Sequence, residues 1–576
     1  MVMKLIPKVT LLASMVIPLM LTPYSKVEES FHTQATYDIM HNNFNLSNYD
    51  HIKFPGVVPR TFFGAAVLSF FTAPLSLLLS CLPCLPFPFP FPFPFPFPFP
   101  FFWSNNLQPF IHEQFLLRLV LLLFNYFSFL SISRSLDSPS CILPPSSRPH
   151  ASSYFLLVTS LQPHLTFYSS RTLPNTFSLI LTSRALSHHL QVTSNTTYHA
   201  SLTATLLVAA ATLFRCDVLI LIFTTGLSLL LSRRLSIFRI FALGADSLLL
   251  SLLLSSPLDS LLWGRGRGRG RDNGRPTFVW PEGEVLLFNT ILGQNRSSDY
   301  GTSPWHWYLT SAIPRAMLGT LLLVPLGADR RLGEVVGPIG AFVGLYSLLP
   351  HKELRFVFPA IVGLNVVAGV GMGRLHEYVF AYVRGGRNKN KGMGKNKGKN
   401  KGNNNSNNNN NNNNNKRQLL AGAVGLGLMG ITGAGTVVFL GASRLNYPGG
   451  VALKRLLEIV PVPVDAQAQA DRVRVHVDVA AAMSGVSLFG FGRENWEFTK
   501  SGYEEENEND LGGEGAYDYA ITEIKPTKNE EGTLLETVEG FDYIDYRRGK
   551  IVTSPKLFIV DKKNNFDKKN ENENVD

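Results

Sequence analysis

The feature that most constrains this chain is a series of long apolar blocks that recurs from residue 5 to residue 443. Each block has about 17–30 residues, and a helix of that length crosses a hydrocarbon core about 30 Å thick. Only helices satisfy the backbone hydrogen bonds of such segments in lipid. Charged residues make up 16% of the chain, against roughly 25% in an ordinary globular protein. The sequence therefore predicts an all-α polytopic membrane protein.

The blocks predict about eleven transmembrane helices. They lie near residues 5–21, 61–82, 110–132, 153–168, 173–193, 203–231, 235–256, 309–327, 333–350, 356–382 and 418–443. The first has no small-x-small cleavage site, so an uncleaved span is expected, and cleavage after Leu21 is the alternative. Lys4 and Lys8 place the N-terminus in the cytosol. Because each span changes the side of the membrane, the cytosolic side then holds Arg233–Arg234, Arg330–Arg331 and the loop 385–417. Residues 22–60, 257–308, the segment "HKE" and everything after 443 fall in the lumen.

Composition divides the chain into three parts. Residues 1–443 form the membrane domain, with low-complexity inserts at 86–101 (Phe/Pro), 264–271 (Gly/Arg) and 387–417 (Lys/Asn/Gly), which we expect to be extended or flexible. Residues 444–500 combine an amphipathic run, "VALKRLLEIV", with the alternating "VRVHVDV", which predicts a small lumenal αβ element. Residues 501–576 are predicted to be a largely flexible polar tail. The net charge of +11 sits mostly in the low-complexity tracts, so it does not indicate nucleic-acid binding.

Two acids open the first lumenal loop. Glu28 and Glu29 follow the first span directly, in "YSKVEESF". A carboxylate at the membrane edge with few cations nearby can have a raised pKa and serve as a general base. The structural alternative is an interfacial charge pair that caps the following helix. The same loop carries Arg60, in "FPGVVPRTFFG".

A cluster of cations follows the ninth apolar block. The segment "LLPHKELRFVFP" brings together His351, Lys352 and Arg355, with Glu353 between them. These cations can neutralise a phosphate, and Glu353 can hold one of them in place. A salt-bridged turn between two spans is the structural alternative.

Aromatic side chains gather in the second large lumenal loop. They include Trp280, Trp305 and Trp307. Such residues can form an interfacial belt, or they can offer flat surfaces on which sugar rings stack. The sequence has no P-loop, no H-E-x-x-H and no D-x-D that would bind a nucleotide sugar through a metal.

Blocks scattered from residue 23 to about residue 490 resemble one family of enzymes. They include "PYSKVEESFHTQATYDI", "YDHIKFPGVVPRTFFG", "WPEGEVLLFNT", "GTSPWHWYLTSAIPR", "YSLLPHKELRFV" and "NYPGGVALKRL". Together they are similar to glycosyltransferase family 22, whose members have the GT-C membrane fold. "KVEESF" and "FPGVVPRTF" resemble the α-1,6 members, which add the eighth mannose to the lipid-linked oligosaccharide. The runner-up is an α-1,2-mannosyltransferase of the same pathway or of GPI anchor assembly.

The resemblance implies a site and a location. The donor would be dolichyl phosphate mannose and the acceptor a lipid-linked oligosaccharide, in a multi-pass protein of the endoplasmic reticulum membrane with its active site facing the lumen. Inversion at the anomeric carbon would need a base, Glu28 or Glu29, with Glu28 slightly favoured. His351, Lys352 and Arg355, helped by Arg60, would hold the donor phosphate. Trp280, Trp305 and Trp307 would orient the acceptor glycan. No cofactor or metal is expected, because the leaving phosphate is held by cations. A transporter would show paired, broken segments in two related halves, and the sequence has no such repeat.

Overall fold

The computed structural model describes residues 2–562 except 43–44, 55–57, 82–107, 149, 192–195, 265–277, 290–300, 393–404, 461–472, 487–495, 501–516, 527–531 and 546. The first half of the chain contributes helices α1 (Val2–Leu21), α2 (Val27–His41), α3 (Asp50–Lys53), α4 (Phe63–Cys81), α5 (Gln108–Asp137), α6 (Ala151–Leu161), α7 (Pro163–Tyr168), α8 (Pro174–His189), α9 (Thr196–Leu213), α10 (Val218–Leu231) and α11 (Ile237–Gly264). They are followed by α12 (Pro281–Leu287), the π-helical turn η7 (Tyr308–Ala312), α13 (Ile313–Met317), the 3₁₀ segment η8 (Leu318–Leu323), α14 (Val324–Gly327), α15 (Gly333–Tyr346), the 3₁₀ segment η9 (Leu354–Val357), α16 (Phe358–Gly392) and α17 (Asn405–Arg444). Short 3₁₀ turns also occur at η1 (Leu46–Asn48) and η4 (Pro145–Ser147).

Several helical segments are long and apolar enough to cross a membrane. Within the described residues there are six: Lys4–Leu21, Glu113–Asp137, Ile237–Trp263, Tyr308–Gly327, Leu354–Val379 and Arg417–Arg444. Shorter apolar helices cover Phe63–Leu78, Val218–Leu231 and Gly333–Tyr346. The predicted multi-span helical architecture is therefore confirmed.

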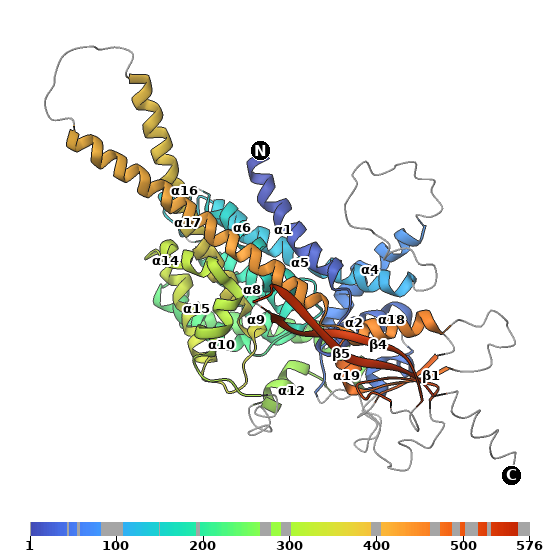
Figure 1. Cartoon of the computed structure of the whole chain (residues 1–576). Coiled ribbons are helices and arrows are strands. Elements are labelled where there is room, and N and C mark those ends of the chain that lie inside the picture. The colour runs from blue at the N-terminus through green and yellow to red at the C-terminus, as the bar shows by residue number, and fades with distance from the viewer. Residues whose placement is uncertain are drawn as a thin grey trace, which may run out of the picture.

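Contacts between helix termini define two ends of the helical bundle. At one end, Lys4 in the first turn of α1 pairs with Asp137 at the end of α5, with 3.2 Å between Nζ and Oδ2. At the other end, Arg118 near the start of α5 donates to the carbonyl of Thr22, just after α1, at 3.1 Å. The two helices are therefore antiparallel. We call these the Lys4 end and the Glu28 end, and in Figure 1 the Lys4 end of α1 is the one marked N.

Two of the predicted spans are wrong, and the two errors cancel in the number of membrane crossings. The segment 61–82 corresponds to α4, which bonds to α2 through Ser69 Oγ and the Thr36 carbonyl at 3.2 Å, and to Glu113 at the start of α5 through Ser76. Both contacts lie at the Glu28 end, so α4 does not run through the bundle. The segment 203–231 forms two helices, α9 and α10, because the charged pair Arg215 and Asp217 makes a turn between them.

These corrections place the turn after α7 at the opposite end of the bundle from the one that the predicted spans give. Alternation through the predicted spans places residues 169–172 opposite the loop 22–60. In the structure, Arg171 lies against the beginning of that loop, with Nη1 2.6 Å from the Tyr24 carbonyl. The two errors cancel for everything after α10, so the HKE segment still shares one end with Glu28.

The sequence predicts an extended Phe/Pro insert and flexible Gly/Arg and Lys/Asn/Gly inserts. The Phe/Pro insert and nearly all of the Gly/Arg insert lie outside the described residues. In the tract 387–417 the described residues contradict the prediction, because α16 continues to Gly392 and α17 begins at Asn405, while 393–404 lie outside the described part. Adding a residue to an existing helix avoids the cost of nucleation, so the adjoining apolar helices can carry weak helix formers. Figure 1 shows both helices projecting beyond the body as two arms.

The C-terminal part is a mixed sheet with two helices. It comprises α18 (Pro448–Ile459), β1 (Val473–Val477), α19 (Val479–Met483), β2 (Trp496–Lys500), β3 (Tyr519–Thr522), β4 (Thr533–Asp545) and β5 (Lys550–Asp561). The strand order is β2-β1-β3-β5-β4. β1 pairs in parallel with β2 and β3, whereas β5 pairs antiparallel with β3 and β4.

This unit corrects the predicted domain boundary at residue 500. Three of its strands come from the segment predicted to be a polar tail, and they bury Ile521, Val538 and Ile559 in one core with α18. Alternating apolar residues in a mostly polar sequence are enough for a half-buried strand. Residues 563–576 lie outside the described part.

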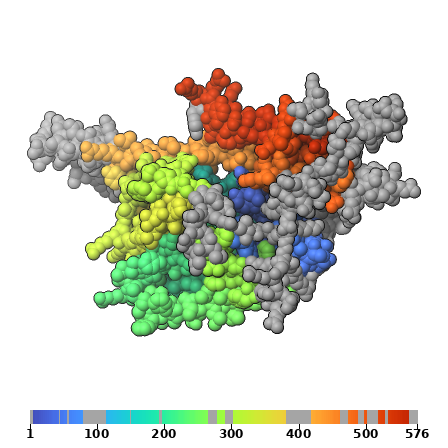
Figure 2. Space-filling view, turned by 90° about the horizontal axis from the view of Figure 1, so that it is seen from below, coloured from blue at the N-terminus to red at the C-terminus, as the bar shows by residue number. Residues whose placement is uncertain are grey.

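The C-terminal unit packs against the first loop. An ideal Cβ at Gly450, in α18, would lie 2.4 Å from the Tyr24 ring, so only glycine allows this approach. Lys500 of β2 lies 4.4 Å from the Phe54 ring centroid. Figure 2 shows α17 and this unit, orange to red, along one side of the helical body, with the blue N-terminal segment beside them.

Candidate active site

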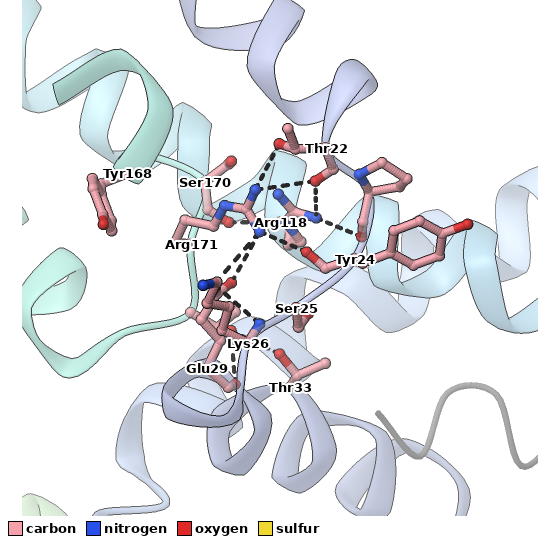
Figure 3. A network of polar contacts seen from close by, with 12 residues as sticks. Thr22, Tyr24, Ser25, Lys26, Glu29, Thr33, Arg118, Tyr168, Ser170 and Arg171 are labelled. Atoms are coloured by element: carbon pink, nitrogen blue, oxygen red, sulfur yellow. Dashed lines mark hydrogen bonds and ion pairs between the residues drawn. The ribbon is translucent and has the colours of Figure 1, made fainter. Parts of the chain in front are cut away.

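Two buried arginines fix the chain where it leaves α1. Arg118 of α5 donates from Nη1 to the carbonyls of Thr22 and Pro23, at 3.1 and 2.7 Å. Arg171, in the turn after α7, donates to Thr22 Oγ1 and to the Tyr24 carbonyl, both at 2.6 Å. Both arginine side chains are fully buried. Because a buried charge must be satisfied by hydrogen bonds, these contacts hold the start of the loop in one conformation (Figure 3).

Glu29 belongs to this buried network. Its Oε2 lies 3.4 Å from Arg171 Nη1, and the two side chains are 5% and 0% exposed. Its Oε1 accepts from the backbone N–H of Lys26, at the start of α2. Figure 3 shows the carboxylate turned toward the arginine. Glu29 therefore matches the structural alternative, a charge that caps the following helix.

Glu28 faces a different environment. Successive residues of a helix point about 100° apart, so Glu28 leaves the network that holds Glu29. Its side chain is 42% exposed, and its Oε1 lies 3.9 Å from Arg355 Nη1. The structure thus brings together a loop acid and the HKE segment, which are more than 300 residues apart in the sequence.

The HKE segment holds Arg355 in place. Glu353 receives Arg355 Nε at 2.6 Å and Arg355 Nη2 at 2.8 Å, a bidentate pair. The same carboxylate lies 3.2 Å from His351 Nε2, and His351 Nδ1 lies 3.1 Å from the Gly301 carbonyl. The expectation that Glu353 orients one of the cations agrees with this geometry.

The Lys352 side chain bonds backbone carbonyls and not the carboxylates that Arg355 contacts. Its side chain is buried, and its Nζ donates to the carbonyls of Ser303 and Leu349, at 2.7 and 2.5 Å. These bonds tie the HKE segment to the loop before η7. Lys352 was expected to bind a phosphate, but in this conformation its ammonium group anchors the loop.

Arg60 lies near Arg215 and Arg355. The Asp259 carboxylate of α11 fixes its neighbours by accepting from Thr61 Oγ1 and the Phe62 N–H, at 3.0 and 2.6 Å. Burial lowers the pKa of Arg60, and so do the charges of Arg215 and Arg355. Arg60 therefore lies near two other guanidinium groups, each of which has a carboxylate partner, Asp217 for Arg215 and Glu353 for Arg355.

Sequence reasoning missed Arg215 and its partners as part of the site. Arg215 makes a bidentate pair with Asp217, at 3.1 and 2.9 Å, and stacks on the Phe356 ring with 5.1 Å to the centroid. Glu282 accepts from the backbone N–H of Cys216 at 2.7 Å. The signal was the position of "FRCD" inside an apolar block of 29 residues, which is longer than one span needs.

Glu282 is the most electrostatically perturbed acid of this cluster. Burial raises its pKa to about 7, against the opposing effect of Arg215. A carboxyl group in this range can change its charge near neutral pH. Among the residues that the structure describes, no group of three or more His, Cys, Asp or Glu side chains is arranged to hold a metal ion.

The three tryptophans occupy two settings. Trp280 Nε1 donates to the Thr212 carbonyl at the end of α9, at 3.1 Å, and its ring packs on Gly283. Trp305 is 67% exposed, and Trp307 packs partly into the main core beside Tyr308. Trp305 and Trp307 adjoin the loop that Lys352 anchors, whereas Trp280 is held by α9.

Comparisons with known proteins agree with this architecture. A profile of the Alg9-like mannosyltransferase family matches residues 8–410. The Dol-P-Man:Man(7)GlcNAc(2)-PP-Dol alpha-1,6-mannosyltransferase of Arabidopsis thaliana is 32% identical over 531 residues, which cover 92% of this chain and 88% of that protein. The protein of the same name from Drosophila melanogaster is 30% identical over 92% of this chain and 64% of its own length.

A solved structure supports the fold. ArnT from Cupriavidus metallidurans in the apo state superimposes with a TM-score of 0.54 and 11% identity, over 97% of both chains. This likeness concerns the fold alone, and it agrees with the expected GT-C architecture. The profile match and the Arabidopsis relative identify the family as well as the fold. On their evidence, the chain belongs to the Alg9-like mannosyltransferase family.

Proposed function

We propose that this protein transfers mannose from dolichyl phosphate mannose to the seven-mannose lipid-linked oligosaccharide, in α-1,6 linkage. The names of the Arabidopsis and Drosophila relatives support the choice of donor and acceptor. The observation that carries the proposal is the position of Glu28, 3.9 Å from Arg355 in a cluster of three arginines. An acid beside an anion site is what an inverting transfer from a phosphate requires.

The proposed mechanism assigns one task to the arginines and another to the Glu28 carboxylate. Arg355, Arg60 and Arg215 hold the donor phosphate, with His351 close by and with Lys352 supporting the loop. The phosphate replaces Glu28 as the partner of Arg355, which frees the carboxylate to take the proton of the acceptor 6-hydroxyl. That oxygen attacks the anomeric carbon while the bond to the phosphate breaks, through an oxocarbenium-like transition state. The leaving group is already stabilised by cations, so the proposal needs no metal.

The site is proposed to face the lumen of the endoplasmic reticulum. Lys4, Arg233–Arg234 and Arg330–Arg331 adjoin the Lys4 end of the bundle, as contacts of Asp137 and Glu334 indicate. Basic residues in short loops favour the cytosol, so the Glu28 end and the C-terminal unit would lie on the lumenal side. There Trp305, Trp307 and Trp280 are proposed to contact the acceptor glycan.

The proposal is tested by supplying the gene to cells that accumulate the seven-mannose lipid-linked oligosaccharide. The expected result is an eight-mannose product whose new mannose is removed by an α-1,6-specific mannosidase. A Glu28→Gln variant expressed at the same level serves as the control and should not restore it. A product sensitive only to an α-1,2-mannosidase would instead assign the runner-up activity.

A further inference from the structure

The loop after α2 carries a short motif that the proposed mannose transfer does not use. Asn45, Leu46 and Ser47 form N-x-S, the acceptor sequence for N-linked glycosylation. The motif falls at the 3₁₀ turn η1, and all three of its residues are described. Three further N-x-S/T motifs begin at Asn195, Asn295 and Asn404. These three asparagines lie outside the described residues, so the structure locates the asparagine of the first motif only.

The turn turns one residue of the motif inward and the other two outward. Leu46 is buried in one apolar cluster with Tyr49 and Trp263, whereas Asn45 and Ser47 are exposed. The Ser47 hydroxyl donates to Asn45 Oδ1 at 2.7 Å. Within the described part of the chain, Asn45 Nδ2, the atom that would carry a sugar, makes no hydrogen bond. The buried leucine therefore presents the amide and the hydroxyl of the motif together to solvent.

The loop that carries this motif is held at the Glu28 end of the bundle. The Asp38 carboxylate of α2 accepts from the backbone N–H of Asp50 at 3.0 Å, which closes the loop on its own helix. His41, the last residue of α2, lies with Nε2 2.7 Å from Glu113 Oε2, near the start of α5. Asn45 therefore lies between two fixed points, on the side that is proposed to face the lumen.

The second motif lies at the opposite end of the bundle. Its hydroxyl residue, Thr197, is in the first turn of α9. In the same turn, His199 approaches His188 of α8, with 3.0 Å between the two Nδ1 atoms. Just after α8, Gln191 Nε2 donates to the Ser135 carbonyl at 3.1 Å, near the end of α5 that defines the Lys4 end. Thr197 therefore belongs to the Lys4 end, where basic residues in short loops favour the cytosol.

We infer that Asn45 is an N-glycosylation site of this protein. The inference rests on the lumenal orientation of the Glu28 end given under the proposed function, because N-linked glycans are added in the lumen. A separate oligosaccharyltransferase would join Asn45 Nδ2 to the first N-acetylglucosamine of a dolichyl diphosphate oligosaccharide. The bond between the anomeric carbon of that sugar and the diphosphate breaks, the amide gives up one proton, and dolichyl diphosphate leaves.

A glycan on Asn45 would not cover the candidate active site. Glu28 lies in the first turn of α2, and Asn45 follows the last turn of the same helix. The length of the helix separates these two positions by about 20 Å. Loss of the glycan should therefore leave mannose transfer unchanged, so transfer activity can verify that each variant is folded.

Treatment of the full chain with peptide N-glycosidase tests the site. Asn295→Gln and Asn404→Gln are introduced first, which removes two of the motifs whose asparagines the structure does not describe. Expressed in eukaryotic cells, this background protein should lose the mass of one glycan on treatment. Asn45→Gln and Ser47→Ala should each abolish the shift, and Ser47→Thr should keep it. Asn48→Gln, exposed in the same turn but outside the motif, is the matched control and should also keep it. A background protein without a shift, or a shift that Asn45→Gln leaves in place, would overturn the inference.

Thr197→Ala separates the orientation from the choice of site. In the same background it should leave the shift unchanged. A shift that Thr197→Ala removes would place the Lys4 end in the lumen and refute both the inference and the proposed orientation. Formation of the eight-mannose product by a wild-type protein without a glycan on Asn45 would overturn the inference alone. A glycan on Asn45 of a protein that transfers no mannose would refute the proposed function and leave the glycosylation site in place.

Discussion

Glu28 and Glu29 show how one helical step separates two carboxylates with different surroundings. Glu29 is enclosed with Arg171, and the two charges pair inside the protein. Glu28 keeps solvent access and meets Arg355 only at the limit of an ion pair. A base must be able to exchange its partner for the substrate, so Glu28 suits that task and Glu29 suits a structural one.

The paired substitutions Glu28→Gln and Glu29→Gln should therefore fail in different ways. Glu28→Gln should lower turnover by roughly 10²–10⁴-fold, the usual contribution of a general base, with an unchanged melting temperature. Glu29→Gln leaves the buried Arg171 without its counter-ion and should lower stability by about 3 kcal/mol. Turnover with purified lipid donor and thermal unfolding in detergent measure the two effects. Near-normal turnover of Glu28→Gln would remove it as the base.

Arg355 and Lys352 make a second informative pair. Arg355→Ala should raise the KM for the donor by about tenfold or more, because it removes a charge-assisted contact to the phosphate, and should change the acceptor KM less. Lys352→Met should lower stability without changing the ratio of the two KM values, since its ammonium group bonds loop carbonyls. Steady-state kinetics with each substrate varied in turn decide this. A larger effect of Lys352→Met on the donor would return Lys352 to the phosphate site.

Glu282 should make stability depend on pH. Its ordinary pKa is 4.5, and burial raises it to about 7 in the folded protein. Between these values the folded state holds more protons than the unfolded state, so this group's contribution to stability is lost as the pH rises from about 4.5 to 7. The melting temperature of the wild type should therefore fall relative to Glu282→Gln over this range. Glu284→Gln, on the same short helix, is the control, and a parallel pair of curves for wild type and Glu282→Gln would contradict the prediction.

At the scale of elements, close helix contacts depend on glycine. An ideal Cβ at Gly327, at the end of α14, would lie 1.8 Å from the Val367 carbonyl of α16. A Cβ at Gly371 of α16 would lie 2.2 Å from the Leu323 carbonyl. Small residues let helix backbones approach in a membrane, where lipid provides no hydrophobic force between helices. The broken helix that contains η8 and α14 is held against α16 in this way.

The substitution Gly327→Ala tests this contact. The added methyl group cannot fit without moving α14 away from α16, and we expect a loss of stability of about 1–3 kcal/mol. Gly340→Ala, in α15, has no atom within 4 Å of the added Cβ and should be neutral or slightly stabilising. Thermal unfolding of the two variants in the same detergent measures the difference. Equal melting temperatures would show that α14 can move freely.

At the scale of the whole molecule, the chain returns to the Glu28 end several times. The loop after α1, the turn after α7, the α9–α10 turn and the HKE segment all meet there. α18 and β2 cover the same loop from the C-terminal side. The site is thus assembled from segments spread over most of the sequence, so it exists only when the bundle is complete.

The turn between α5 and α6 discriminates between this arrangement and the simple count of apolar blocks. Asp137 binds Lys4, so a cysteine at Ser138 should react with an impermeant maleimide from the cytosolic side of intact microsomes. The count of blocks places the same residue in the lumen. A cysteine at Ser303, beside the HKE segment, is the matched lumenal control and should react only after the membrane is opened. Lumenal labelling at residue 138 would refute the position of α4.

Much of what could be predicted about the spans and the candidate site came from individual residue types. Long apolar runs determine multiple helical spans because lipid leaves the backbone no other partner. Charged groups beside apolar segments are costly and are usually functional. This rule selected the glutamate doublet, the HKE segment and Arg60. Glu282 could not be selected, since nothing local distinguishes a buried acid from a loop acid, whereas for Arg215 the excess length of its apolar block was a signal that the prediction did not use.

The sequence by itself determined the multi-span helical class, the family resemblance and the short set of candidate residues. These depend on local chemistry: hydropathy over one helix length and charges at its ends. Only the tertiary structure decided that Glu29 is an anchor, that Lys352 holds a loop, that α4 does not cross the bundle, and that residues 519–561 complete a sheet. Each of these depends on which partner a group meets across the fold, and burial beside a counter-charge or a carbonyl is a property of the packed molecule.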